Sequence, residues 1–251
     1  MNYKLEGNGK TLVFIHGLSD NLLYWEFLAG NLKNDYRVLR FDLRGHGESE
    51  LGEDEITIDT YTNDLNNLLE ELDISEVNLI GFSLGSAVGL DFISKYPQKV
   101  DSLVLMSTFY KADDDLKNIL NQLKDSLNIG FEEFYDNILP MVLCPEVIEE
   151  NKEDLELLKN MTSPNANTEA YIKAVDVCLN FNAEKYLSEI NVPTLILASK
   201  HDEMSTLDMQ EELYTKIKNS ELVILDNVKH NLLVGENNEK ILTLLKEFLK
   251  S

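Results

Sequence analysis

The sequence predicts an α/β protein with a mostly parallel, doubly wound sheet of about seven to eight strands and an all-helical lid inserted after the sixth strand. Three observations lead to this fold class. Short apolar runs alternate with segments of helical periodicity along most of the 251 residues. Between Phe109 and about Tyr186 this alternation stops and only helical patterns occur. Ser83, with a glycine two residues to each side, stands where an apolar run meets a helical segment.

Seven short segments are predicted to be strands, and several of them are apolar at nearly every position. Strands of a parallel sheet have this composition because helices cover both of their faces. Their alternation with helices predicts right-handed crossover connections. The seven segments are Tyr3–Glu6, Leu12–Ile15, Tyr36–Phe41, Val77–Ile80, Ser102–Met106, Thr194–Ala198 and Glu221–Leu225.

Five segments between these strands show the periodicity of amphipathic helices. In the first of them, Leu22, Trp25 and Leu28 fall on one apolar face. The five segments are Leu22–Leu32, Tyr61–Leu72, Ser86–Tyr96, Leu207–Lys218 and Glu236–Leu249.

The long segment without strand patterns is predicted to be a helical lid. Residues 1–109 and 187–251 would then form the core, and residues 110–186 the lid. Ligands of open α/β sheets bind at the carboxyl ends of the strands, so a lid there would shape the pocket and exclude water; the alternative is an appendage without a role in the site. The predicted lid helices are Asp114–Leu127, Phe131–Leu139, Pro145–Asn160 and Asn167–Asn182, with Pro140, Pro145 and Pro164 at helix boundaries.

The composition argues against several classes of partner. A net charge of −23, from 22 basic and 45 acidic residues, disfavours nucleic acid and anionic membranes. No stretch approaches about 18 consecutive apolar residues, so no membrane span is expected. The N-terminus lacks the apolar region of a signal peptide, and Cys144 and Cys178 fit no metal-ligand spacing. We therefore expect a cytoplasmic protein with reduced thiols, without a cofactor or catalytic metal, that is a monomer or a homodimer.

The pentapeptide Gly81–Gly85 carries the strongest chemical signal. A serine attacks a carbonyl only when it is exposed and a base takes its proton. A tight strand-to-helix turn would expose Ser83 above the sheet and aim the amides of the helix N-terminus at a developing oxyanion. Downstream, Asp202 and His230 each follow a strand-like run. The order serine, aspartate, histidine is the one expected on α/β-hydrolase scaffolds.

Further segments extend this resemblance over almost the whole chain. Phe14–Leu18 resembles the strand-end H-G segment of the α/β-hydrolase fold superfamily, Asp42–Ser49 resembles its D-x-R-G-x-G-x-S turn, and Ile190–Leu197 resembles the strand that enters its acid turn. Within the superfamily, the chain is similar to small carboxylesterases and lactonases with a helical lid. It departs from the pattern at Ser86, where many relatives have a second glycine; serine is small enough for close helix–strand packing.

The resemblance implies a role for each matching residue. Ser83 would be the nucleophile, His230 would take its proton and pass it to the leaving group, and Asp202 would orient His230. The backbone N–H groups of Leu18 and Leu84 would form the oxyanion hole.

Other polar residues near these motifs have more modest expected roles. His16 is expected to be a structural hydrogen-bonding group under the oxyanion loop. Glu203, beside Asp202, is a rival candidate for orienting the base. No histidine has a partner at metal-ligand spacing.

A serine nucleophile favours acyl transfer to water, from an ester, thioester or lactone. Residues 110–185 contain 7 lysines, 16 acidic residues and no arginine, so no arginine of the lid can clamp an anionic substrate. We therefore expect a small, neutral and fairly apolar ester or lactone. Six apolar residues are candidates for lining its pocket: Leu18, Trp25, Leu84, Phe109, Leu143 and Phe181.

Three alternatives remain open at the level of sequence. A carbon–carbon bond hydrolase or lyase would use the same triad. A non-catalytic ligand-binding homologue would keep the scaffold without turnover, and a cofactor-free peroxidase-type activity is a third reading. The fold alone does not choose among them.

Overall fold

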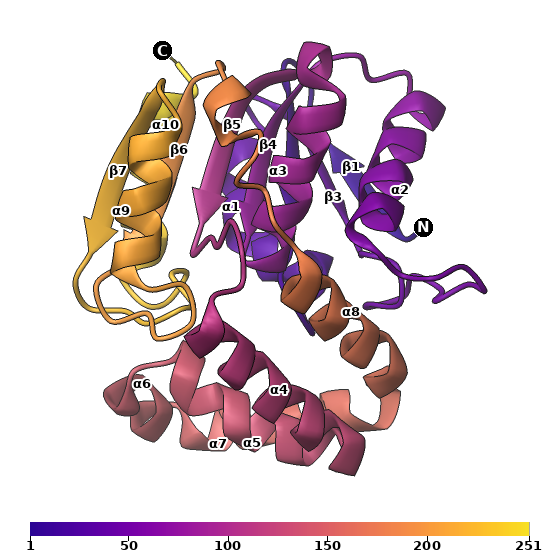
Figure 1. The fold of residues 1–251 in the computed structure, drawn as a ribbon, viewed down its shortest axis with the longest axis vertical. Helices are drawn as coiled ribbons and strands as arrows, with labels where there is room; N and C mark the ends of the chain where they lie inside the picture. Colours follow the sequence, from indigo (N-terminus) through magenta and orange to yellow (C-terminus); the bar gives the residue numbers. More distant parts are fainter. Residues whose placement is uncertain (251) are drawn as a thin grey trace.

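The computed structural model describes residues 1–250, which form one seven-stranded sheet covered by helices (Figure 1). The strands are β1 (Tyr3–Glu6), β2 (Thr11–Ile15), β3 (Arg37–Phe41), β4 (Val77–Phe82), β5 (Val100–Met106), β6 (Thr194–Ser199) and β7 (Ser220–Leu225). Their order is β1-β3-β2-β4-β5-β6-β7; β1 pairs antiparallel with β3 and every other pair is parallel. The predicted α/β class and mostly parallel sheet are confirmed.

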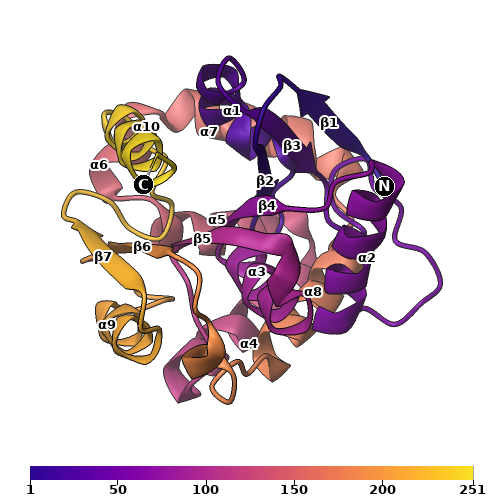
Figure 2. The same cartoon turned by 90° about the horizontal axis from the view of Figure 1, so that it is seen from above.

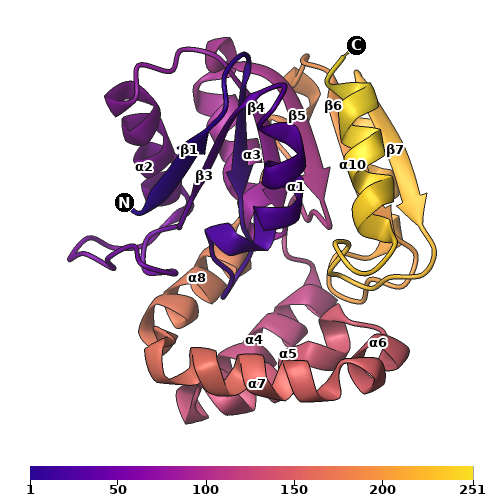
Figure 3. The ribbon, with the colours of Figure 1, turned by 180° about the vertical axis from the view of Figure 1, so that it is seen from behind.

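Helices cover both faces of the sheet because its inner strands are apolar on both sides. Every residue of β2, β4 and β6 is buried. The core helices are α1 (Glu26–Leu32), α2 (Ile58–Glu71), α3 (Leu84–Lys95), α9 (Leu207–Lys216) and α10 (Asn237–Phe248). As Figures 2 and 3 show, α1 and α10 pack on one face, and α2, α3 and α9 pack on the other. Short 3-10 helices are η1 (Leu22–Trp25), η2 (Pro97–Lys99), η3 (Ser163–Asn165) and η4 (Leu187–Glu189).

Five helices between β5 and β6 form a separate layer, which we call the cap layer. They are α4 (Asp114–Ile129), α5 (Phe131–Val142), α6 (Pro145–Glu150), α7 (Lys152–Thr162) and α8 (Thr168–Asn180). The Asp113 carboxylate caps α4 by accepting a 2.8 Å hydrogen bond from the Leu116 amide. Figure 1 shows the cap layer beyond the carboxyl ends of the strands, where the arrows point.

The chain enters and leaves the cap layer at one place. The Ala183 amide donates a 2.7 Å hydrogen bond to the Tyr110 carbonyl, and Lys111 forms an isolated antiparallel bridge with Asn182. The Lys111 ammonium also lies 3.1 Å from the Glu184 carboxylate. The two ends of the insertion are therefore joined to each other beside the sheet.

Three details differ from the sequence-based expectation. The helical insertion follows the fifth strand and not the sixth, because the residues that precede it form five strands, β1 to β5. Pro140 lies inside α5 instead of ending it, and it removes one hydrogen bond from the helical ladder, the bond that a residue there would donate to the Asp136 carbonyl. The segment Pro145–Asn160 is two helices, because Asn151, with φ −116° and ψ 21°, leaves the helical conformation.

Candidate active site

Ser83 lies at a sharp turn between β4 and α3. Its backbone has φ 51° and ψ −115°, a conformation that non-glycine residues rarely adopt and that costs about 1–3 kcal/mol. The turn fits only because its neighbours lack a side chain: a Cβ on Gly85 would lie 2.1 Å from the Ile15 carbonyl oxygen, and one on Gly81 would lie 2.6 Å from Gly85. The local sequence therefore allows the chain to turn sharply at Ser83, away from the direction of β4.

Ser86, the departure from the family pattern, has a bonding role in this turn. Its hydroxyl donates a 2.7 Å hydrogen bond to the Gly81 carbonyl and accepts a 3.2 Å bond from the Met106 amide. It is fully buried. The side chain thus ties the turn to the end of β5, a function that glycine could not perform.

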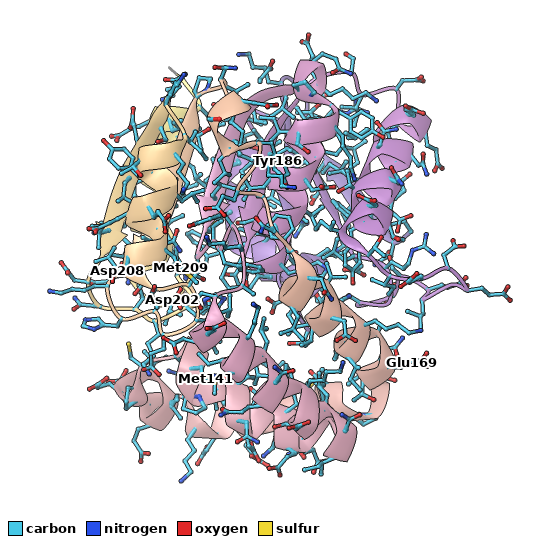
Figure 4. All side chains as sticks on the ribbon, in the orientation of Figure 1. Met141, Glu169, Tyr186, Asp202, Asp208 and Met209 are labelled. Atoms are coloured by element: carbon cyan, nitrogen blue, oxygen red, sulfur yellow. The ribbon has the colours of Figure 1, made fainter. Side chains whose placement is uncertain are left out.

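Ser83, His230 and Asp202 form a continuous hydrogen-bonded chain. The Ser83 hydroxyl lies 2.9 Å from His230 Nε2, and His230 Nδ1 lies 2.8 Å from Asp202 Oδ2. All three side chains are buried or nearly so. Figure 4 labels Asp202 in the loop after β6, on the side of the sheet that faces Met141 of α5. Residues separated by 147 and 28 positions are thus brought together.

The Asp202 carboxylate is held by its own loop. Its Oδ1 accepts 2.9 Å hydrogen bonds from the amides of Met204 and Ser205, which leaves Oδ2 for His230. Because a carboxylate only accepts hydrogen bonds, His230 Nδ1 must carry a proton, so Nε2 can accept the proton of Ser83. The three groups are therefore arranged for proton transfer away from the serine.

Serine hydroxyls at strand ends fix the loop that carries His230. Ser107, just after β5, donates a 2.6 Å hydrogen bond to the His230 carbonyl, and Ser199, at the end of β6, donates to the Val228 carbonyl. Ser205 donates to the Ser107 carbonyl at 2.8 Å. These serines were not identified from the sequence. The one local signal was that Ser107 and Ser199 each stand at the end of an apolar strand, and that these strands, β5 and β6, are neighbours in the sheet.

The backbone amides of Leu18 and Leu84 have no hydrogen-bond acceptor among residues 1–250. Leu84 is the first residue of α3, so its N–H points out of the helix N-terminus. Leu18 follows Gly17, whose carbonyl lies 2.8 Å from His16 Nδ1. Both amides are thus available to a ligand.

His16 holds the loop that carries Leu18. Its Nε2 accepts a 2.9 Å hydrogen bond from the Leu43 amide, so Nδ1 carries the proton and donates to the Gly17 carbonyl. Complete burial lowers the pKa of His16 to about 4, which keeps the ring neutral. The expected structural role agrees with this geometry.

A cavity of about 100 Å³ opens beside Ser83 and His230. Of the six predicted pocket residues, Leu18 and Phe109 line it. Residues of α4 and α5 supply an apolar wall, and residues of the loops after β2 and β7 supply polar groups. The cavity is lined by Leu18, Ser19, Asp20, Tyr24, Phe82, Ser83, Phe109, Leu116, Leu120, Ile138, Val142, Cys178, Met204, Ser205, His230 and Asn231.

The other four predicted pocket residues lie outside the cavity. Trp25 is fully buried against Phe14 on the α1 face, and Leu84 points into the core on the opposite face. Phe181 does not reach the cavity; it packs edge-on against Phe109, with ring centroids 5.9 Å apart. Leu143 is buried just after α5. Core and pocket positions use the same apolar residue types, so the sequence did not separate them.

The rival orienting residue, Glu203, faces away from His230. Its carboxylate pairs at 2.7 Å with the Lys229 ammonium. Lys229 also donates a 2.8 Å hydrogen bond to the Pro140 carbonyl of α5. Glu203 therefore belongs to a contact between the core and the cap layer.

Within residues 1–250, no group of three or more histidine, cysteine, aspartate or glutamate side chains is arranged to hold a metal ion. Over the same residues, every helix is too short or too polar to cross a bilayer.

Known proteins resemble this chain in sequence. The family model of the alpha/beta hydrolase fold matches residues 10–140. An uncharacterized protein of Mycobacterium tuberculosis is 35% identical over 141 residues, which cover 56% of this chain and 40% of that protein. The chain thus spans less than half the length of this relative. The AB hydrolase superfamily protein YisY of Bacillus subtilis is 28% identical over 251 residues, which cover 98% of this chain and 93% of the relative.

Solved structures share the fold over the whole chain. An α/β hydrolase enzyme from a Medee basin deep-sea metagenome library has a TM-score of 0.93 at 24% identity, covering 100% of this chain and 94% of that one. The enol-lactonase from Burkholderia xenovorans LB400 has 0.91 at 22%, covering 100% and 96%. An esterase from Exiguobacterium antarcticum has 0.89 at 21%, covering 99% and 95%. Likeness at these identities shows a common fold alone.

Proposed function

Because this chain belongs to the α/β hydrolase fold family, we propose that it is a serine hydrolase that cleaves small carboxylic esters, lactones or thioesters through an acyl-enzyme. The observation that carries this proposal is the chain of hydrogen bonds at 2.9 and 2.8 Å from Ser83 through His230 to Asp202. A strained serine that lines the cavity beside a correctly protonated imidazole is the arrangement that activates a hydroxyl nucleophile.

In the first half-reaction, Ser83 Oγ bonds to the carbonyl carbon of the substrate while His230 Nε2 takes the hydroxyl proton. The bond to the leaving oxygen or sulfur then breaks, and His230 returns the proton to that atom. In the second half-reaction, water attacks the acyl-enzyme and gives a proton to His230. The acid leaves, and the proton restores the Ser83 hydroxyl.

The charge on the carbonyl oxygen during each step needs donors that are already in place. The unpaired amides of Leu18 and Leu84 supply them in this proposal, at about 3 kcal/mol of transition-state stabilisation each. Because both donors belong to the backbone, they are set by the turn after β4 and by the loop that His16 holds. No side-chain donor is required.

The cavity supports a small substrate without a negative charge. Its wall from α4 and α5 is apolar, and none of its lining residues is a lysine or an arginine. An anionic substrate would lack a cationic partner there. The names of an esterase and an enol-lactonase among proteins of the same fold favour ester and lactone chemistry over carbon–carbon bond cleavage. In this proposal, residues 110–186 act as the cap that shapes the pocket.

The test combines labelling with turnover. A fluorophosphonate probe should label the wild type at Ser83, and p-nitrophenyl acetate and butyrate should be hydrolysed. Ser83→Ala should lose the label and about 10⁶-fold in kcat. Ser94→Ala, which changes a hydroxyl on an outer turn of α3, is the matched control and should keep both. Equal turnover by Ser83→Ala and wild type would reject the serine-hydrolase assignment.

A further inference from the structure

Asp20 places a carboxyl group in the catalytic cavity, on the loop after β2. A Cβ built on Gly17 would lie 3.1 Å from Asp20 Oδ2, so the carboxyl group lies against the oxyanion loop. Burial raises the pKa of Tyr24 well above its usual range, and the nearby charge of Asp20 raises it further. The hydrogen-bond chain of Ser83, His230 and Asp202 does not include Asp20.

No lysine or arginine among the described residues balances the charge of this carboxyl group. Asp20 forms no ion pair there, and no lysine or arginine lines the cavity. The nearby hydroxyl of Tyr24 donates instead to Asn231, at 3.0 Å. A carboxylate in a confined cavity is costly. Burial raises the pKa of Asp20 to about 7, although the charge of His230 and the Gly17 amide each lower it. A bound cation would remove that cost.

Aromatic rings surround the same space. Tyr24 stacks on Phe82 with ring centroids 4.7 Å apart, and both line the cavity together with Phe109. Aromatic faces attract alkylammonium groups, and a nearby carboxylate adds a direct charge interaction. Aromatic rings and a carboxylate without a lysine or arginine partner are the chemistry that recognises an ammonium ion.

We propose that Asp20 is a specificity-determining residue, which selects substrates that carry an alkylammonium group within a few bonds of the scissile ester. This inference rests on the proposed function, and it revises the expected neutral substrate, which depended on the missing arginines alone. The positive group faces Asp20 and the aromatic rings. The uncharged end of the substrate faces the apolar wall of the cap layer.

The experiment compares esters of equal shape that differ only in charge. Acetylcholine and neohexyl acetate carry the difference in the alcohol, and the p-nitrophenyl esters of trimethylammonioacetate and tert-butylacetate carry it in the acyl group. The assay is run at about pH 8, above the pKa of Asp20. The quantity measured is the ratio of kcat/KM for the charged ester to kcat/KM for its neutral partner.

In at least one pair, Asp20→Asn should lower this ratio about ten-fold or more. Asp20→Glu keeps the charge and should lower it less. Asp101→Asn removes an exposed carboxylate at the start of β5, so it is the matched control and should leave the ratio unchanged. A ratio unchanged by Asp20→Asn in both pairs would overturn the inference, while hydrolysis of the neutral esters would still support the proposed function.

A binding measurement tests the proposed cation site independently of the proposed hydrolase activity. Choline and the neutral alcohol neohexanol are titrated by calorimetry into Ser83→Ala, with and without Asp20→Asn. Choline should bind more tightly than neohexanol only when Asp20 is present, whether or not esters are hydrolysed. Equal binding of the two alcohols to Ser83→Ala would count against the cation site.

Discussion

The Asn231 amide donates a 3.0 Å hydrogen bond to the Val142 carbonyl, so the loop that carries His230 is bound to the end of α5. The neighbouring Lys229 ammonium donates to the Pro140 carbonyl at 2.8 Å. Two contacts, from the residues on either side of His230, thus connect the proposed base to the cap layer. A movement of α5 away from the core must break them or pull on the His230 loop.

Removing the Lys229 ammonium should loosen this connection. Lys229→Met keeps most of the aliphatic chain and loses the hydrogen bond to Pro140, at a cost of about 1 kcal/mol. Amides of residues 131–142 should then exchange with deuterium faster than in the wild type. Glu203→Gln breaks only the ion pair with Lys229 and should leave that exchange nearly unchanged. Equal protection of α5 in Lys229→Met would mean that this contact does not hold the cap layer.

Replacing Asp202 should harm catalysis far more than stability. Asp202→Asn can still accept the hydrogen bonds that the amides of its loop donate, but its NH₂ group cannot accept the hydrogen bond that His230 Nδ1 donates. We expect kcat to fall about 10⁴-fold, because the imidazole is held in the wrong tautomer. Ester turnover and thermal unfolding measure the two effects separately. A loss below ten-fold would remove Asp202 from the proposed mechanism.

Ser86→Ala should destabilise the turn around Ser83. The substitution leaves the buried Gly81 carbonyl and Met106 amide short of a partner, which costs about 1–3 kcal/mol. Urea unfolding measures this loss as a lower midpoint. Ser94→Ala, in the same helix, removes the hydrogen bond that an exposed serine donates to the Asp91 carbonyl and should cost less. Equal midpoints for the two variants would contradict the bridging role.

Acidification should destabilise the fold through its buried histidines. Burial lowers the pKa of His16 to about 4 and that of His46 to about 3, while the unfolded chain titrates near 6.5. Between these values the unfolded chain binds protons that the native rings do not, so stability falls as the pH drops below 6.5. Each ring contributes about 1.4 kcal/mol per pH unit there. Urea unfolding at several pH values gives the slope, and a flat profile would show that the rings are not buried as neutral groups.

The ionisation of Asp20 should have the opposite effect on stability, which it lowers as the pH rises. Its native pKa of about 7 lies above the unfolded value of 3.8, so the native state retains a proton that the unfolded chain releases. The resulting stability is present below the unfolded pKa and is lost as the pH rises through 7. Asp20→Asn cannot ionise, so near pH 8 it should melt roughly 2–4 °C or more above the wild type. The gain should shrink on acidification, and a constant gain would point to packing instead of charge.

The strands and the residues of the proposed triad were predictable because each has a local sequence signal. β2, β4 and β6 are mostly apolar and fully buried, and the glycines two residues to each side of Ser83 are those that a close backbone approach requires. Asp202 and His230 each follow a strand, where polar residues converge in a parallel sheet. These signals need no knowledge of how distant parts pack.

The cavity was not predictable because it is made by packing between distant parts. Asp20 and Asn231 lie on loops and Tyr24 lies in η1, and these segments form a cavity only when the cap layer is placed over them. Trp25 was expected in the pocket, but it is buried against Phe14, whereas its neighbour Tyr24 lines the cavity. An aspartate in a loop carries no sign of whether its partner will be water, a lysine or a ligand.

The hydrogen bond from Ala183 to Tyr110 has a consequence for engineering. Because the two ends of residues 111–182 already meet, a short turn could replace that whole segment without changing the pairing of β5 with β6. A helical segment taken from another protein could be grafted between the same two residues. The apolar wall that α4 and α5 give the cavity could therefore be exchanged as one module, with Asp20 and the turn at Ser83 unchanged.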